Sequence, residues 1–371
     1  MHKFFTSSFD ASIYLQQPEQ NAGRDEILEV GKLYYGSNEV ASAMDIARTL
    51  IKFNTTQISS SIVENIGTGS YSVFLNLKSA NSEEIPLEYT LYANAISGSW
   101  KMGTGTKFDN ITSDGVSWYY LNGSSKWQDL SGSYPAQTDT SSILNGGGGL
   151  WYSASMASQS FSNEPDDIRM DVTNIVKLWI SGSNKLTNDG IILHHHTSAS
   201  LYSDTTDYGV LKFFSKETST IYEPKLELVW DDSVGNFNTG SLLPVTGSAE
   251  DGYKVVVTNL KREYPSNSKV KIRVKGRDMY PLKTFTTGSF AYDQSKYLPS
   301  GSVYYQIEDY VTNETIVPFG DYSKLSCDST SNYFNLDTST YPINRTYKLK
   351  LKIVESGIST IIDNKLIFEI V

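Results

Sequence analysis

Cysteine is nearly missing from this chain, whose 371 residues include one, Cys327. A lone cysteine makes no internal disulfide and no paired-thiol metal site, so packing must stabilise the fold. Long apolar runs are missing too: no stretch approaches the ~20 residues of a membrane helix, and residues 1–6 lack the apolar core of a secretory signal. We therefore expect no membrane association and no export.

Positive charge is scarce and unevenly distributed. The net charge is −10 and the isoelectric point is about 5.0, and an anionic surface repels a phosphate backbone, so nucleic acid is a poor partner. Residues 1–235 carry 15 basic and 27 acidic side chains, whereas residues 236–371 carry 16 and 14. All six Trp and all four His also precede residue 235. The two parts therefore have different cores.

Residues that favour strands and turns are abundant, with 25 Tyr and 27 Gly. The length exceeds the roughly 250–300 residues at which a single core stops growing. Residues 231–248 are rich in Gly, Ser, Asn and Pro, which is typical of a linker. We predict two β-sandwich domains joined there.

Alternating apolar residues predict individual strands. In residues 269–275, Val and Ile face one side and cations the other, and residues 347–353 and 366–370 repeat this pattern. Such short, half-buried antiparallel strands predict a sandwich of immunoglobulin size in the second part. In the first part, residues 71–77 and 226–230 are predicted strands.

A single helix is predicted in the first part. Thr173 is its expected N-cap, and Gly182 offers a left-handed stop. Between them Ile175, Val176, Trp179 and Ile180 form an apolar stripe.

Several short blocks of residues 10–230 occur in the order found in one known family. They are Asp10 to Tyr14, Asn21-Ala22-Gly23, Leu28 to Gly31, Arg48 to Phe53, Trp100 with Gly103-Thr104-Gly105, Asp114 to Trp118, Asp171 to Gly182, Asn188 to Leu193, Phe214 to Glu217 and Pro224 to Leu228. In this order they resemble the bacterial surface modules called DNRLRE domains, which are related to a carbohydrate-binding module family. The resemblance implies a jelly-roll β-sandwich.

The second part is similar in style to β domains of virion structural proteins of large tailed phages, particularly from Val274 through Asp309. The predicted fold is therefore all-β. It comprises an N-terminal jelly-roll β-sandwich over residues 1–232, a linker over 233–248 and an immunoglobulin-like β-sandwich over 249–371.

Two candidate binding sites stand out in the first part. His194 and His196 would point to the same face of a strand over 191–196 and could share a metal, although a polar strand end is the commoner meaning of such a run. Trp127 and Trp151 flank polar or glycine-rich loops, where exposed indole rings would stack on sugars. The alternative is that these tryptophans fill the sandwich, which is commoner for tryptophan.

The sequence shows no catalytic constellation. Cys327 lies in a part without His, and neither a nucleophile elbow nor a phosphate-binding loop is present. We therefore expect no enzymatic activity and no cofactor. The predicted function is a structural component of a tailed-phage virion (a tail, neck or decoration protein), multicopy or homo-oligomeric, which contacts other virion structural proteins. The alternative is a carbohydrate-binding module for surface glycans.

Overall fold

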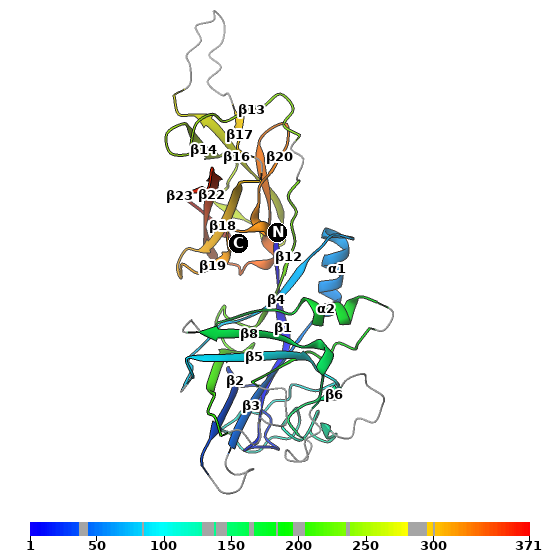
Figure 1. Ribbon diagram of the computed structural model, residues 1–371. Helices are drawn as coiled ribbons and strands as arrows, with labels where there is room; N and C mark the ends of the chain where they lie inside the picture. The colour runs from blue at the N-terminus through cyan, green and yellow to red at the C-terminus, as the bar shows by residue number, and fades with distance from the viewer. Residues whose placement is uncertain are drawn as a thin grey trace, which may run out of the picture. The chain divides into compact units, whose positions relative to one another are not determined.

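In the computed structural model, the chain forms two compact units (Figure 1). It describes residues 1–36, 44–83, 85–127, 147–162, 167–182, 185–195, 205–234, 238–280, 295–299 and 301–371, and the backbone of 137–138. The N-terminal unit comprises Phe4–Thr68 and Ser72–Leu228. The C-terminal unit comprises Val229–Val371 with Met1–Lys3 and Gly69–Tyr71.

These units differ in detail from the predicted boundaries. The division falls at 228/229, and the residues predicted as a linker over 233–248 belong to the C-terminal unit. Within that stretch Leu243–Pro244 (β13) pairs with Lys296–Tyr297 (β17). Met1 belongs there because its α-amino group donates a hydrogen bond to the Trp230 carbonyl over 2.7 Å. Turn-forming composition alone therefore did not mark where the packed unit begins.

The N-terminal unit is built on one large sheet, and its fold is β as predicted. Its strands are β1 (His2–Tyr14), β2 (Ile27–Tyr34), β3 (Met44–Phe53), β4 (Ser72–Leu77), β5 (Glu88–Ala95), β8 (Ala157–Ser162), β9 (Ile168–Asp171), β10 (Ile191–His194), β11 (Gly209–Phe214) and β12 (Lys225–Val229). They run in the order β8-β5-β10-β3-β1-β12-β4-β9, and β2 joins β3 to β11. A further short pair is β6 (Gln137–Thr138) with β7 (Trp151–Tyr152).

The two end strands of this sheet lie beside each other. Gln159 of β8 donates its side-chain amide to the Asp167 carbonyl over 3.3 Å, and it accepts from the Arg169 amide of β9 over 2.9 Å. The sheet therefore curls back on itself, as in sandwiches and barrels, and encloses its core.

Two α-helices are present among the described residues. The predicted one is confirmed as α2 (Thr173–Ile180), which buries Ile175, Val176 and Trp179. Thr173 is not its N-cap, however: the cap residue is Val172, and the Thr173 hydroxyl accepts the Val73 amide of β4 over 2.8 Å. In the described part of the chain, no helix is long and apolar enough to cross a membrane.

The other helix, α1 (Thr55–Asn65), was not predicted. Asn54 caps it by accepting hydrogen bonds from the Thr56 and Gln57 amides. Ile58 and Ile62 form its buried stripe. A polar cap followed by apolar residues four apart is a valid signal, but only two apolar residues carry it.

The C-terminal unit is an immunoglobulin-like sandwich of two sheets. One sheet contains β14 (Tyr253–Val257), β16 (Lys269–Asp278), β21 (Asn332–Asp337) and β20 (Ser326–Cys327), with β17 beside β16 and β13 beside β17. The other sheet has the order β15 (Glu263–Tyr264), β23 (Ile358–Ile370), β22 (Arg345–Glu355), β18 (Val303–Asp309), β19 (Thr315–Val317). This division of strands between two sheets is the immunoglobulin arrangement. The strands predicted over 269–275, 347–353 and 366–370 lie in β16, β22 and β23.

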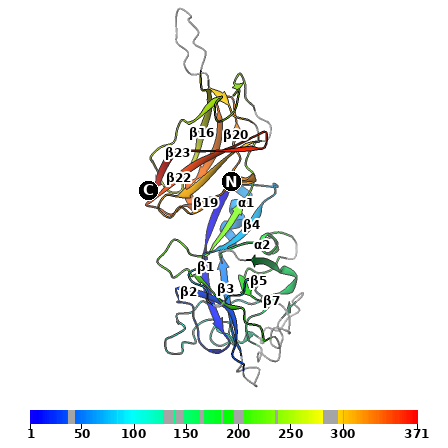
Figure 2. The ribbon, with the colours of Figure 1, turned by 60° about the vertical axis from the view of Figure 1, so that its left-hand side comes forward.

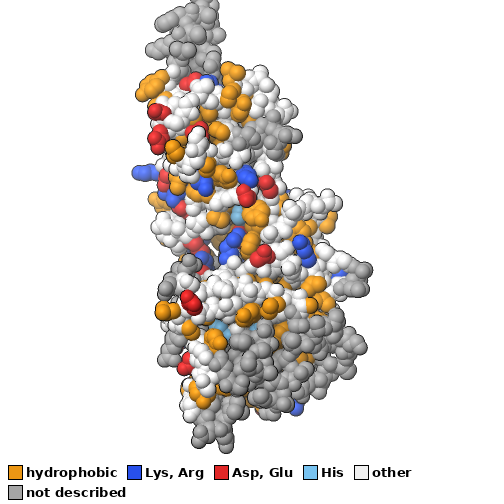
Figure 3. Space-filling view, viewed as in Figure 1, with side chains coloured by type: hydrophobic (Ala, Val, Ile, Leu, Met, Phe, Trp, Pro, Cys, Tyr) orange, Lys and Arg blue, Asp and Glu red, His pale blue; other side chains and the backbone are white. Residues whose placement is uncertain are grey.

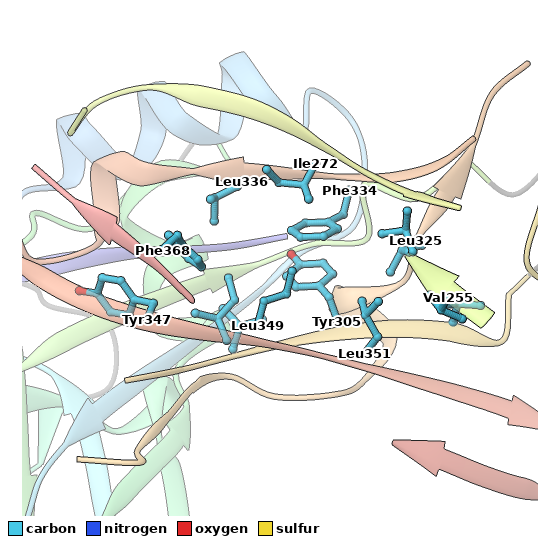
Figure 4. Close-up of a cluster of buried hydrophobic side chains, with 14 of the residues drawn as sticks. Val255, Ile272, Tyr305, Leu325, Phe334, Leu336, Tyr347, Leu349, Leu351 and Phe368 are labelled. Carbon is cyan, nitrogen blue, oxygen red and sulfur yellow. The ribbon is translucent and has the colours of Figure 1, made fainter. Parts of the chain in front are cut away.

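The inner faces of the two sheets share one core, which Figure 4 shows in close-up. Tyr305 of β18 stacks on Phe334 of β21, with ring centroids 4.1 Å apart and an interplanar angle of 13°. Ile272 comes from β16 and Leu349 from β22, and both are buried. No disulfide crosses between the sheets, because Cys327 is the sole cysteine of the chain. Aromatic and aliphatic packing therefore holds the two sheets together.

Tyr347 closes one corner of this sandwich. Its hydroxyl donates to the Pro342 carbonyl over 3.1 Å, near the start of β22, in the manner of the tyrosine corner of immunoglobulin folds. We expect Tyr347→Phe to lower the stability of the C-terminal unit by about 1 kcal/mol, because one hydrogen bond is lost while the ring remains. Urea denaturation of the intact chain, followed by circular dichroism, measures this loss. An unchanged midpoint for the C-terminal unit would contradict it.

Candidate functional site

A buried asparagine organises the glycine-rich loop that follows β5. The Asn21 side chain is fully buried, and its amide nitrogen donates to the Met102 carbonyl over 2.7 Å and to the Val116 carbonyl over 2.8 Å. Its side-chain oxygen accepts from the Gly105 amide over 2.8 Å. One side chain therefore ties the two ends of the loop to the segment between β1 and β2.

The glycines of this loop are needed because backbone lies directly against Asn21. Gly103 has φ = +80°, and a Cβ there would lie 2.3 Å from the Asn21 side-chain oxygen. A Cβ on Gly115 would lie 2.5 Å from the side-chain nitrogen. The Asn21-Ala22-Gly23, Gly103-Thr104-Gly105 and Asp114 to Trp118 blocks, remote in sequence, thus meet at one point.

Two aspartates hold the outer part of the loop. Asp114 accepts from the Thr104 amide over 3.0 Å and from its hydroxyl over 2.8 Å, and these bonds lower the pKa of the Asp114 carboxyl. Asp25 accepts from the Lys107 amide over 3.1 Å, while burial raises the pKa of Asp25. The Lys107 ammonium in turn lies 2.6 Å from a Glu29 carboxylate oxygen. The loop is therefore fixed before any partner arrives.

The tip of this loop presents two large apolar side chains to solvent. Phe108 is 87% exposed and Ile111 is 73% exposed. Between them Asp109 accepts the Thr106 hydroxyl over 2.6 Å, which fixes the turn. We call Phe108 and Ile111 the apolar loop tip. Exposed apolar side chains on a preformed loop are the usual anchors of protein contacts, since little conformational freedom is lost on binding.

The sequence did not single out the apolar loop tip. Phe108 and Ile111 lie in a glycine-rich loop without alternation, so no periodic signal marks them as buried or exposed. An aromatic residue in a loop of polar residues was the available hint.

The prediction that Trp127 and Trp151 expose their rings to sugars is wrong. Trp127 is fully buried, and its ring nitrogen donates to the Ser117 carbonyl over 3.0 Å. Trp151 is 2% exposed and lies 5.0 Å from the Arg48 guanidinium and 4.6 Å from the His194 ring. Both indoles fill the interior together with Trp118, so neither offers a face to a sugar. Large aromatic side chains tend to be buried, and they are buried here although polar loops lie next to them in the sequence.

His194 has the surroundings of a core residue. It is 1% exposed, its Nε2 lies 3.0 Å from the Asn94 side-chain oxygen, and its ring packs on Trp151. His195 faces the other way and stacks on Tyr208. His196, the proposed second metal ligand, lies outside the described residues. Over the part of the chain that the structure describes, no three His, Cys, Asp or Glu residues are grouped to hold a metal ion.

Asp10 joins the opening block to the last blocks of the N-terminal unit. Its carboxylate accepts the Lys216 amide over 2.8 Å and the Ser7 hydroxyl over 3.1 Å. Burial, opposed by these hydrogen bonds, raises the pKa of Asp10 to about 6. The side chain is 1% exposed, so the charged form is poorly solvated.

This raised pKa predicts a pH dependence of stability. Because the folded state binds the proton more tightly, the contribution of Asp10 is full below the ordinary pKa near 4 and is lost as the pH rises through about 6. We expect Asp10→Asn to remove about 2–3 kcal/mol of this decline between pH 4 and pH 7, since an amide keeps an acceptor but carries no charge. Denaturation of both proteins across this range measures the difference. Parallel pH profiles would contradict the assignment.

Comparisons with known proteins give little. No family model matches the chain, and no curated protein matches it. A DUF4785 family protein of Legionella pneumophila is similar over 100% of this chain and 65% of its own length, with 9% sequence identity and a TM-score of 0.18. A beta-glucuronidase of Parabacteroides merdae is similar over 99% of this chain and 35% of its own length, with 10% identity and a TM-score of 0.15. The chain thus spans less than two thirds of either protein, and scores this low assign it neither a fold family nor an activity.

Proposed function

We propose that this chain is a structural component of a tailed-phage virion, a tail, neck or decoration protein present in several copies and acting through contacts with other virion proteins. The observation that supports this best is the apolar loop tip. Phe108 and Ile111 are exposed on a loop that Asn21, Asp25 and Asp114 hold rigid. A preformed apolar anchor suits a component that must dock in fixed geometry.

The distribution of exposed residues also agrees with this proposal. On the face seen in Figure 3, hydrophobic side chains are interspersed with charged ones. Contacts through such a surface combine apolar anchors with a polar surround, as protein interfaces do. The sequence resemblance of residues 274–309 to virion domains is the reason for proposing a virion as the assembly.

The test uses purified particles from the source that encodes the chain. We expect quantitative mass spectrometry of gradient-purified virions to find the chain in multiple copies per particle. We expect the double variant Phe108→Ser, Ile111→Ser to reduce its incorporation at least tenfold. Val63 and Leu87, both 74% exposed in the same unit, give the matched control Val63→Ser, Leu87→Ser, which should be incorporated normally.

Two results would overturn the proposal. One is absence of the chain from particles that contain their capsid proteins. The other is normal incorporation of the loop-tip variant, which would remove the observation on which the docking role depends. Unchanged tryptophan fluorescence of the variant shows that a loss of incorporation does not come from unfolding.

The second candidate is a carbohydrate-binding module, and one observation favours it. With Trp127 and Trp151 buried, Phe108 offers an exposed ring beside Asp109, whose carboxylate could accept hydrogen bonds from sugar hydroxyls. Glycan-array binding that Phe108→Ala abolishes would support this function. If the unaltered chain binds no glycan on the array, the carbohydrate-binding function is excluded.

A further inference from the structure

One strand of the C-terminal sandwich has an edge that is unpaired over part of its length. β23 spans Ile358–Ile370 and pairs with β22 along one side, as Figure 2 shows. On its other side, β15 pairs with Glu369 and Ile370 alone. In the described part of the chain, no strand pairs with residues 358–366 on that side. Among the described residues, the backbone groups on that side are left for another strand to pair with.

The first five residues of this edge carry none of the side chains that usually protect a sheet edge, and a bulge that contains Asp363 and Lys365 follows them. Residues 358–362 read Ile-Ser-Thr-Ile-Ile, without charge, proline or glycine. Ile358 is 66% exposed and Ile361 is 59% exposed. Edges are normally blocked by charged residues, prolines or bulges, and β-branched residues favour extended pairing. We call residues 358–362 the open edge.

Lys352 and Glu355 are the charged residues of β22 that pair with the open edge. The Lys352 ammonium lies over the Tyr304 ring, 4.9 Å from its centroid. The Glu355 carboxylate accepts a hydrogen bond from the Tyr253 hydroxyl over 2.6 Å. Both charged groups are therefore already in contact with other residues of the C-terminal unit.

We propose that the open edge binds the same edge of a second copy of this chain, so that two β22–β23 sheets join antiparallel across a two-fold axis. A strand edge is self-complementary in this arrangement, since each copy offers the same alternation of donors and acceptors. With the axis at Thr360, Ile358 of each copy lies opposite Ile362 of the other. All directly opposed residues are uncharged.

Charge favours this copy-to-copy contact over contacts through the first part of the chain. Residues 236–371 carry 16 basic and 14 acidic side chains, so this part of the chain scarcely repels its own copy. Residues 1–235, with 15 basic and 27 acidic side chains, repel their own copies. The joined edge is short, so the association is weak and is strengthened where many copies are held close together. This inference deepens the proposed function and rests on it for the multiple copies.

Sedimentation velocity of the intact purified chain, over a concentration series reaching about 200 μM, tests the pairing. We expect a concentration-dependent dimer that Ile361→Lys weakens at least tenfold, because a charge at the edge is the usual block to strand addition. Val311, 75% exposed after β18, gives the control Val311→Lys, which should dimerise like the parent. In the dimer, amide hydrogen exchange should slow in residues 358–362.

Three results would overturn the inference: a monomer throughout the series, a dimer that Ile361→Lys leaves unchanged, or a dimer without protection of residues 358–362. Because the measurement uses the purified chain, it is independent of whether the chain is found in virions. A dimer absent from particles would keep this inference and remove the proposed function. A virion component that stays monomeric would do the reverse.

Discussion

Asn21→Ala is expected to lower the free energy of unfolding of the N-terminal unit by about 3–5 kcal/mol. The substitution leaves the buried Val116 carbonyl, the buried Gly105 amide and the partly buried Met102 carbonyl without their partner. Each orphaned buried group costs roughly 1–3 kcal/mol, and the three belong to one loop. The loop would then lose the support that fixes Phe108 and Ile111.

Tryptophan fluorescence during urea denaturation measures this effect selectively. Five of the six tryptophans lie in the N-terminal unit, and Trp230 lies in the C-terminal one. Asn110→Ala is the matched control, because Asn110 is an exposed asparagine of the same loop, and its effect should stay within about 0.5 kcal/mol. Equal midpoints for Asn21→Ala and Asn110→Ala would show that Asn21 does not organise the loop.

Phe334→Ala is expected to destabilise the C-terminal unit by about 3–5 kcal/mol. Phe334 is 4% exposed and stacks on Tyr305 between the two sheets, so its removal opens a cavity and ends the ring contact. No disulfide bridges the sheets to compensate, since the chain has one cysteine. The loss therefore falls directly on the packing between the sheets.

Hydrogen exchange of the intact chain, followed by mass spectrometry, locates this loss. The amides of β16 and β21 should exchange faster in Phe334→Ala, while those of the N-terminal unit keep their rates. Phe334→Leu, which keeps most of the volume, should cost less than half as much. A uniform change in both units, or equal effects of the two variants, would count against this account of the core.

Local sequence patterns predicted the strands whose apolar residues alternate. Ile272 and Val274 are buried in β16, as the alternation with lysine and arginine predicts, and β22 follows the same rule. α2 was predicted because its apolar stripe is dense. α1 was not predicted because only Ile58 and Ile62 lie four residues apart among its Ser and Thr residues, which gives a weak periodic signal.

The candidate site was predicted poorly, because exposure is a property of the whole fold. Trp127 and Phe108 are both aromatic residues in or beside polar loops, yet one is fully buried and the other is 87% exposed. Nothing local distinguishes them. Their difference comes from Asn21, which lies more than 80 residues before Phe108 and holds the loop so that its tip points outward.

By itself, the sequence determined the all-β class, the presence of two differently composed parts and the faces of the regular strands, since these depend on composition and on a period of two residues. The tertiary structure decided which aromatic side chains are buried, where the unit boundary falls and which strand edge is left open. These depend on contacts between segments far apart in the chain, such as Asn21 with Val116 and β15 with the last residues of β23.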